Sequence, residues 1–425
     1  MRIRIQGRQP LRGVYHVSGS TNAAMALIAA SMLTDAPIKL TNVPDTVSVG
    51  VMLEVGQSLG LIVDEGADGR GGDVMLDASK VFGRALEREH TDALSSTLLF
   101  LAAILVRRRH ARMTIDYAIS RLHPQLTALR DLGLTVKVDN GVIDLEARIW
   151  NTAEIVLTQT SVTTTALVAM LAAALGKQTT IINAASEPHI VDLLNLLMQM
   201  GAKVEGIGSN LLTIYGREKL SGGSFAVSPD YVEAASIAAM AAITGGRLTI
   251  EGIHRRDLRL IAKVYERLGL HCSLDDEALV VPVHERFDIS NREEDVDVSI
   301  DSSPWPGFPS DLIPMATVIA TQARGTVLIH EKLFSNRLLL VDRLNGMGAQ
   351  IIHCDPHRAI VLGPTPLQGV YIDNPDVRTG LAMLGAALCA DGETLIDSAQ
   401  TFDRYFDHVL DKLTTIGAKI KRSEA

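Results

Sequence analysis

One pattern recurs six times along the chain, and it limits the possible folds more than any other feature. In each copy a helical stretch ends at an apolar residue, a glycine follows, and a short run of alternating apolar and polar residues comes next. The six glycines are separated by 68 to 79 residues: Gly60, Gly133, Gly201, Gly269, Gly348 and Gly417. Glycine suits the position after a helix because positive φ is needed there, and alternation is typical of a half-buried strand. The sequence therefore predicts six copies of one βαβαββ-type unit.

Six alanine-rich stretches form a second element with the same period. They cover residues 22–32, 95–106, 161–175, 232–243, 311–320 and 377–390. Small side chains let backbones approach closely, as helices buried on several sides require. Six units are too many for one core, so we expect an α/β protein with two domains of three units each, the first three units ending near Asp230.

Charge and composition exclude several classes of protein. A formal net charge of −9 disfavours a general nucleic-acid binder, which would need a basic face. The apolar stretches are too short to span a membrane, and the first residues carry no apolar core of a signal peptide. The three cysteines lie far apart without the spacing of a metal site. We expect a cytoplasmic protein with free thiols, no metal, no nucleic-acid partner and no membrane association.

The expected buried helices begin with residues that could bind an anion. These starts are residues 18–22, 161–163, 310–311 and 376–378, rich in Ser, Thr, Asn and Asp. Helix N-termini present unpaired N–H groups and a partial positive charge, so several of them together would hold a phosphate or carboxylate. The alternative is that these residues simply cap their helices. Both interpretations stay open at this point.

The most unusual local sequence is 303–311, where three prolines and a glycine fix the path of a loop that ends at Asp311. Asp311 could cap the next helix, or it could take a proton from a hydroxyl. Arginines near the ends of expected elements could hold a carboxylate or phosphate in bidentate fashion: Arg121, Arg337, Arg378 and Arg404. The run 107–109 is also all arginine, and we expect it to be solvated surface.

Several motifs, in order and nearly end to end, resemble those of the UDP-N-acetylglucosamine enolpyruvyl transferases. They are the sequences at 18–24, 183–192, 308–311, 334–337, 376–378 and 403–404. The resemblance, that of a diverged paralogue, implies two inverse α/β barrel domains, each of three βαβαββ-type repeats. It further implies that residues 1–20 and 231–425 form the first lobe, that residues 21–230 form the second, and that the active site lies in the cleft between them.

The resemblance implies transfer of the enolpyruvyl (carboxyvinyl) group from phosphoenolpyruvate to a hydroxyl of a UDP-N-acetylglucosamine-like or other nucleotide acceptor, with release of phosphate. In the family this reaction belongs to peptidoglycan precursor synthesis for the cell wall. It requires no metal and no organic cofactor, and its partners are small-molecule substrates: phosphoenolpyruvate and a nucleotide or nucleotide sugar.

Residue roles are implied by the same motifs. Asp311 would be the base for the acceptor hydroxyl, and arginines would hold the donor's carboxylate and phosphate. Asn22 would touch the acceptor and the phosphate, and Leu333 would lie near the acceptor sugar. The implied substrate-binding residues are Asn22, Arg121, Ser161, Val162, Leu333, Arg337, Asp376, Arg378 and Arg404.

The chain departs from the family pattern at positions that carry chemistry. Thr21, Val47 and Gln159 stand where the family has Lys, and Ser95 stands where it has Arg. The segment 114–121 replaces a loop whose tip carries Cys in the family, and no thiol is present in it. Losing two cationic contacts to a phosphate donor would cost about 3–6 kcal/mol.

Three interpretations follow from these departures. The first is an enolpyruvyl transferase with a different acceptor, in which Asp116 replaces the missing Cys as the acid. The second is a related enzyme on the same scaffold with another donor or an elimination reaction. The third is a catalytically impaired protein that binds a nucleotide sugar or another anion. The sequence leaves the acceptor and the oligomeric state open.

Overall fold

The computed structural model describes residues 1–66, 72–290, 298–373 and 379–423. The chain divides into two compact units: unit 1 is Met1–Ser18 with Pro229–Ala425, and unit 2 is Gly19–Ser228. The two segments that pass between the units are hydrogen-bonded to each other on both sides of the boundary. Asp230 N donates to Ser18 O at 2.9 Å, and Ser20 N donates to Ser228 O at 2.8 Å.

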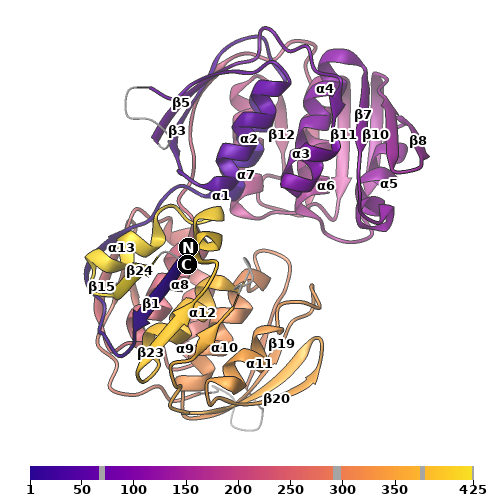
Figure 1. Ribbon diagram of the computed structural model, residues 1–425. Helices are drawn as coiled ribbons and strands as arrows, with labels where there is room; N and C mark the ends of the chain where they lie inside the picture. Colours follow the sequence, from indigo (N-terminus) through magenta and orange to yellow (C-terminus); the bar gives the residue numbers. More distant parts are fainter. Residues whose placement is uncertain (67–71, 291–297, 374–378, 424–425) are drawn as a thin grey trace. The chain divides into compact units, whose positions relative to one another are not determined.

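The described strands of unit 2 form three four-stranded sheets (Figure 1). The first has the order β14 (Gly223–Ala226), β3 (Ile38–Val43), β5 (Gly72–Asp77), β4 (Ile62–Asp64). The second has the order β6 (Ala85–Leu86), β7 (His110–Thr114), β9 (Val142–Glu146), β8 (Thr135–Asp139). The third has the order β10 (Trp150–Val156), β11 (Gly176–Ile182), β13 (Leu211–Tyr215), β12 (Lys203–Glu205).

Within the described part of unit 1 there are again three four-stranded sheets. One has the order β16 (Ser273–Leu274), β17 (Ala278–Val281), β15 (Arg247–Glu251), β2 (Arg12–His16). Another has the order β18 (Ser299–Asp301), β19 (Gly325–His330), β21 (Arg358–Gly363), β20 (Gln350–Asp355). The last has the order β22 (Tyr371–Ile372), β23 (Glu393–Ile396), β1 (Arg2–Gln6), β24 (Lys419–Ser423).

The same pairing scheme appears in all six of these sheets. Each contains one parallel pair at one edge, such as β10 with β11, followed by two antiparallel pairs, such as β11 with β13 and β13 with β12. The parallel strand comes from the preceding stretch of chain, or, for β14 and β2, from a segment distant in sequence. The repeated βαβαββ-type unit expected from the sequence is therefore confirmed.

Three helices in each unit are buried on nearly every side, as their alanine content predicts. In unit 2 they are α1 (Thr21–Ser31), α4 (Phe100–Arg108) and α6 (Val162–Leu175); in unit 1 they are α8 (Tyr231–Ile243), α10 (Ile313–Gln322) and α12 (Gly380–Cys389). Every residue of α12 is buried. Sheets surround helices in both units, which is the inverse α/β barrel architecture (Figure 1).

The other described helices connect the strands. They are α2 (Val47–Ser58), α3 (Arg88–Ala93), α5 (His123–Asp131), α7 (Pro188–Gln199), α9 (Arg255–Arg267), α11 (Leu340–Gly346) and α13 (Val409–Thr415). Short 3₁₀ turns are η1 (Ser95–Leu99), η2 (Ile119–Leu122), η3 (Ser310–Leu312) and η4 (Ala399–Arg404). All six repeat glycines have positive φ, between 81° and 110°: Gly60, Gly133, Gly201, Gly269, Gly348 and Gly417. This is the backbone conformation for which glycine was expected there.

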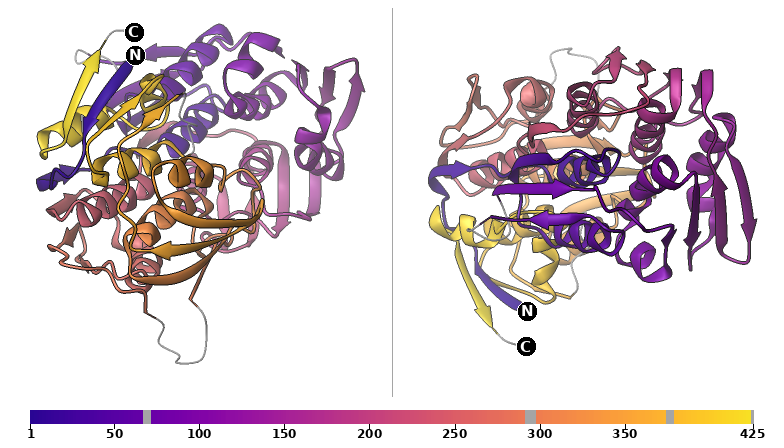
Figure 2. Two further views of the ribbon diagram at one scale, coloured as in Figure 1. Left: turned by 60° about the horizontal axis from the view of Figure 1, so that its bottom comes forward. Right: turned by 90° about the horizontal axis from the view of Figure 1, so that it is seen from above.

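The two ends of the chain meet in one sheet of unit 1. Strand β1 lies between β23 and β24, with Ile3 opposite Ile396 and Ile5 opposite Ile420. Figure 2 shows the first and last strands side by side in the left view. Unit 1 is therefore completed only by residues from both ends of the sequence.

Candidate functional site

In unit 1, Asp311 and Arg337 form an ion pair at the start of α10. Arg337 Nη2 donates to Asp311 Oδ1 at 2.5 Å. The Arg337 side chain is only 6% exposed, whereas that of Asp311 is 43% exposed. Neither η3 nor α10 is capped by a side chain, so the capping interpretation of Asp311 is wrong. A buried cation instead fixes one oxygen of an accessible carboxylate, and within the described structure no hydrogen bond to Oδ2 is found.

Arg337 is held on two further sides. Its Nε donates to Ser310 Oγ at 3.3 Å, and its guanidinium carbon lies 5.2 Å from the centroid of the Phe334 ring. Arg337 Nη1 is buried and has no hydrogen-bond partner among the described residues. A buried guanidinium donor without a partner is costly. An acceptor oxygen of an anion would satisfy it.

The loop before Arg337 is shaped by Glu331, a residue that sequence reasoning missed. Glu331 is fully buried and accepts hydrogen bonds from the backbone N–H groups of Leu333 and Phe334, at 2.7 and 3.0 Å. Leu333 is half-buried. The sequence offered no signal for Glu331, because its partners are neither charged nor regularly spaced.

Three other candidates belong to unit 1, and the structure describes one of them. Arg404 ends η4 and is half-buried. Asp376 and Arg378 lie outside the described residues, so their expected roles rest on the resemblance alone.

In unit 2, three candidates lie in the first turns of buried helices. Asn22 is in the first turn of α1 and is half-buried. Ser161 caps α6: its Oγ accepts from Thr164 N at 3.3 Å and from Thr164 Oγ1 at 2.8 Å. Val162, also half-buried, is the first residue of α6. The Ser161 side chain is thus already used as a cap, while the N-terminal N–H groups of both helices keep the polarity that attracts anions.

The segment that replaces the family's Cys loop is anchored by Arg88. Asp116 forms an ion pair with Arg88, whose Nε also lies 3.2 Å from Asp92 Oδ2. The Asp116 side chain is 55% exposed. Arg121 is exposed, and its guanidinium carbon lies 6.0 Å from the Tyr117 ring centroid. An arginine partner stabilises the ionised carboxylate, whereas a proton donor must be protonated, so acid catalysis by Asp116 would require this pair to separate.

Thr21, where the family has Lys, is buried in unit 2. The side chain is 1% exposed, and its hydroxyl lies 3.2 Å from that of Thr46, the residue that caps α2. Thr21 and Thr46 therefore contact each other through small polar side chains in a buried part of unit 2.

A buried polar network lies at the boundary of unit 1, where α8 begins. Lys412 Nζ lies 3.0 Å from Glu233 Oε1 and 2.5 Å from Ser18 Oγ, and Tyr15 OH donates to Glu233 Oε1 at 2.6 Å. Asp230 caps α8, accepting from Val232 N and Glu233 N at 2.8 and 3.0 Å. Burial, and then the nearby Glu233 carboxylate, raise the pKa of Asp230 to about 7.

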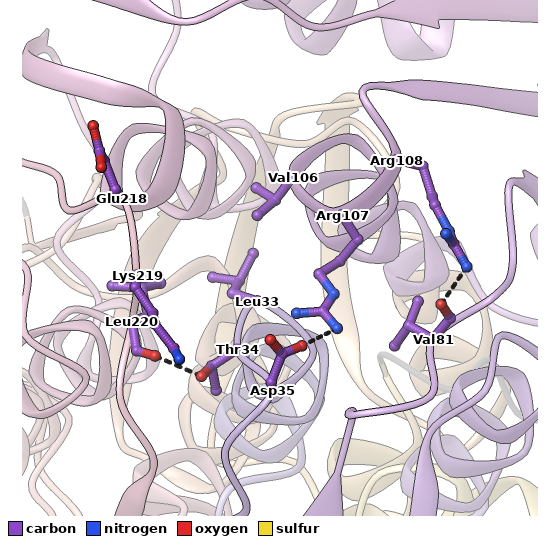
Figure 3. A pocket seen from close by; sticks show the side chains of 10 residues that line it. All are labelled: Leu33, Thr34, Asp35, Val81, Val106, Arg107, Arg108, Glu218, Lys219 and Leu220. Atoms are coloured by element: carbon purple, nitrogen blue, oxygen red, sulfur yellow. Dashed lines mark hydrogen bonds and ion pairs between the residues drawn. The ribbon is translucent and has the colours of Figure 1, made fainter.

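Unit 2 also contains a cavity of about 440 Å³ beyond the C-terminal ends of α1 and α4 (Figure 3). Figure 3 shows Arg107 reaching Asp35 and Arg108 reaching Val81 O. Arg107 also donates to Ala78 O at 3.2 Å, and its side chain is only 19% exposed. The expectation that the run 107–109 is solvated surface is therefore wrong for Arg107, whereas Arg108 and Arg109 are exposed as expected. Arg107 forms an ion pair with Asp35 and donates to the Ala78 carbonyl instead of facing bulk water.

Three absences apply to the described part of the chain. No cluster of His, Cys, Asp and Glu there could hold a metal ion. No described helix is long and apolar enough to cross a membrane. Cys272, Cys354 and Cys389 are free thiols, and burial raises the pKa of Cys272 to about 11.

Solved structures show the same fold. The enolpyruvyl transferase NikO from Streptomyces tendae superposes with a TM-score of 0.88 at 22% identity, covering 100% of this chain and 99% of that one. EPSP synthase from Acinetobacter baumannii gives a TM-score of 0.77 at 16% identity with full coverage of both chains. The architecture is thus that of the two-domain enolpyruvyl transferases.

Sequence comparison establishes the family. The chain belongs to the EPSP synthase (3-phosphoshikimate 1-carboxyvinyltransferase) family, which it matches over residues 5–413. UDP-N-acetylglucosamine 1-carboxyvinyltransferase of Treponema denticola is 39% identical, with 99% of each chain covered. The enzyme of the same name from Treponema pallidum is 38% identical, with 98% covered. The resemblance inferred from the motifs is confirmed at the level of the family.

Proposed function

We propose that this protein transfers the enolpyruvyl group from phosphoenolpyruvate to a hydroxyl of a UDP-N-acetylglucosamine-like nucleotide acceptor and releases phosphate. The relatives that match over nearly the whole chain carry the name of this reaction. The observation that carries the proposal is the Asp311–Arg337 pair, in which a buried cation orients an accessible carboxylate. Acceptor attack needs a positioned base of this kind.

Each candidate residue has a place in this proposal. Asp311 takes the proton of the acceptor hydroxyl through its free oxygen. Arg337 and Arg404 supply positive charge for the carboxylate and phosphate of the donor, and Asn22 contacts acceptor and phosphate. The N-terminus of α6, at Ser161 and Val162, faces the acceptor's diphosphate, which the polarity of a helix N-terminus stabilises.

The remaining proposed roles concern the acceptor and the methylene carbon. Leu333 lies near the acceptor sugar and Arg121 near the nucleotide base. For Asp376 and Arg378, which lie outside the described residues, we keep the role in the substrate site that the resemblance implies. After separating from Arg88, Asp116 supplies a proton to the methylene carbon as the acceptor oxygen bonds to the neighbouring carbon. The resulting methyl group gives a proton back as phosphate leaves, which restores the methylene carbon of the product.

Phosphate release tests the proposal directly. The protein is incubated with phosphoenolpyruvate and, in turn, with a panel of nucleotides and nucleotide sugars. Asp311→Asn should abolish turnover, since loss of a general base costs about 10²–10⁴-fold, and should leave ligand-induced thermal stabilisation intact. Asp342→Asn, an exposed carboxylate of the same unit, is the matched control and should keep wild-type turnover. Turnover by Asp311→Asn at the control rate would remove Asp311 from the mechanism.

A second candidate function is binding without turnover. Buried Thr21 in the place of the family's Lys, and the engagement of Asp116 by Arg88, favour it. The same assay distinguishes the two. Silence across the whole panel, together with stabilisation of the protein by a nucleotide sugar, would establish the binding protein and exclude the transferase.

A further inference from the structure

Glu331 lies at the point where three segments of unit 1 meet, directly after β19. Its side chain is fully buried. Ser302 Oγ, which follows β18, donates to Oε1 at 2.8 Å, and Ser310 Oγ, in η3, donates to Oε2 at 2.7 Å. With the two N–H groups of Leu333 and Phe334, four donors converge on one carboxylate.

The main chain of Glu331 is fixed as firmly as its side chain. Its N–H donates to His357 O at 2.8 Å, and its carbonyl oxygen lies 2.7 Å from the ring Nδ1 of His357. If the partners of the carboxylate moved, Glu331 could follow them only by breaking these two contacts with His357. It acts as a fixed anchor for the loops around it.

Three of the four partners of Glu331 have, or adjoin, a residue to which the proposed reaction gives a role. Ser310 precedes Asp311 in the chain and also accepts a hydrogen bond from Arg337 Nε at 3.3 Å. Leu333 is bonded directly, and Phe334 lies against the Arg337 guanidinium. A continuous chain of hydrogen bonds thus runs from Glu331 through Ser310 to Arg337 and on to Asp311.

We infer that Glu331 is the positioning residue of this part of the site: through Ser310 and the Leu333–Phe334 turn it sets the geometry of the Asp311–Arg337 pair, without touching substrate itself. The inference rests on the proposed function for its kinetic consequence. The inference also predicts that Glu331 holds the Arg337 side chain in its buried position, and this prediction does not depend on turnover. A misplacement of reacting groups by about 1 Å can cost about 100-fold in rate.

The kinetic test uses Glu331→Gln, which keeps the size of the side chain and replaces one acceptor oxygen by a donor. We expect kcat for phosphate release to fall about 10- to 100-fold while KM for phosphoenolpyruvate changes far less. Ser310→Ala should lower kcat in the same way. The double variant should be less impaired than the product of the two single effects, because both act through one chain of contacts.

A buried hydroxyl elsewhere in unit 1 provides the matched control. Thr394 is fully buried, and its Oγ1 has no hydrogen-bond partner among the described residues. Thr394→Val should leave kcat unchanged. A wild-type kcat in Glu331→Gln, or multiplicative effects of the Glu331 and Ser310 substitutions, would overturn the inference and leave the proposed function standing.

A second readout does not need turnover. Phenylglyoxal modifies accessible arginines, and labelling is located by mass spectrometry of peptides. Arg337 should be protected in the folded wild type and in Thr394→Val, because its side chain is 6% exposed, and should react in folded Glu331→Gln. Equal protection of Arg337 in Thr394→Val and Glu331→Gln would refute the inference, whether or not any acceptor supports phosphate release. Absence of phosphate release with every acceptor would refute the proposed function instead.

Discussion

Replacing Asp230 by Asn should make unit 1 more stable at neutral pH and leave its stability nearly unchanged in acid. Asp230 caps α8 through two backbone N–H groups, and Asn caps a helix as well as Asp does. The substitution therefore keeps the cap and removes a buried charge. Burial and the Glu233 carboxylate raise the pKa of Asp230 from 3.8 to about 7.

The sign and size follow from proton linkage. Between these two pKa values the folded state holds a proton that the unfolded state has released, so stability falls as the pH rises through this range. A pKa raised from 3.8 to about 7 corresponds to about 4 kcal/mol of destabilisation at pH 8 and to less than about 1 kcal/mol at pH 4. Asp230→Asn should recover up to these amounts.

Urea denaturation at the two pH values measures the effect. The chain has two tryptophans, and the Trp305 ring lies 5.2 Å from that of Tyr231, which directly follows Asp230. In a Trp150→Phe background, fluorescence therefore reports on unit 1. Asp397→Asn should instead lower the stability of unit 1 at pH 8, because a hydrogen bond from Arg2 lowers the pKa of Asp397 to about 2. A loss of stability in Asp230→Asn at pH 8, or an equal gain at both pH values, would refute the reasoning.

Two further predictions concern the Asp116 segment and the repeat glycines. Asp116→Asn should lower kcat for phosphate release by about 10²-fold or more if this carboxyl is the acid. The control Asp92→Asn removes the other partner of Arg88 and should leave kcat unchanged. Equal kcat values in the two variants would exclude Asp116 as the acid. Gly133→Ala should lower the free energy of unfolding by about 1–2 kcal/mol through backbone strain alone, because a Cβ on Gly133 meets nothing within 4 Å. Gly269→Ala should lower it by more, because a Cβ on Gly269 would also lie 2.5 Å from Asp288 N. Equal losses in urea denaturation would contradict the steric argument.

The repeat was predictable because it depends on local chemistry. A glycine after a helix and a small residue inside one are required wherever the unit occurs, so all six copies carry them and all six glycines adopt positive φ. Asp311 could be selected as a candidate for the same kind of reason, since a proline-rich loop of unusual sequence leads to it.

The contacts of the site were not predictable, because they join residues that are distant in sequence. Glu331 is one of 49 acidic residues, and its importance comes from donors at 302 and 310 that only the fold brings to it. Arg107 was misjudged for a related reason. A run of three arginines is usually solvated, but Arg107 is bonded to Asp35 and to the Ala78 carbonyl, which are distant from it in sequence.

The pairing of β1 with β23 and β24 determines when unit 1 can be completed during synthesis. Strand β1 must wait for its neighbours until residue 419 has been made, roughly 20 to 80 s later at 5–20 residues per second. Unit 2 is continuous from Gly19 to Ser228 and has all its strands long before then. During this interval the nascent chain carries a finished barrel, while the unpaired strand β1 exposes Ile3 and Ile5, which are buried in the finished unit 1, to chaperones.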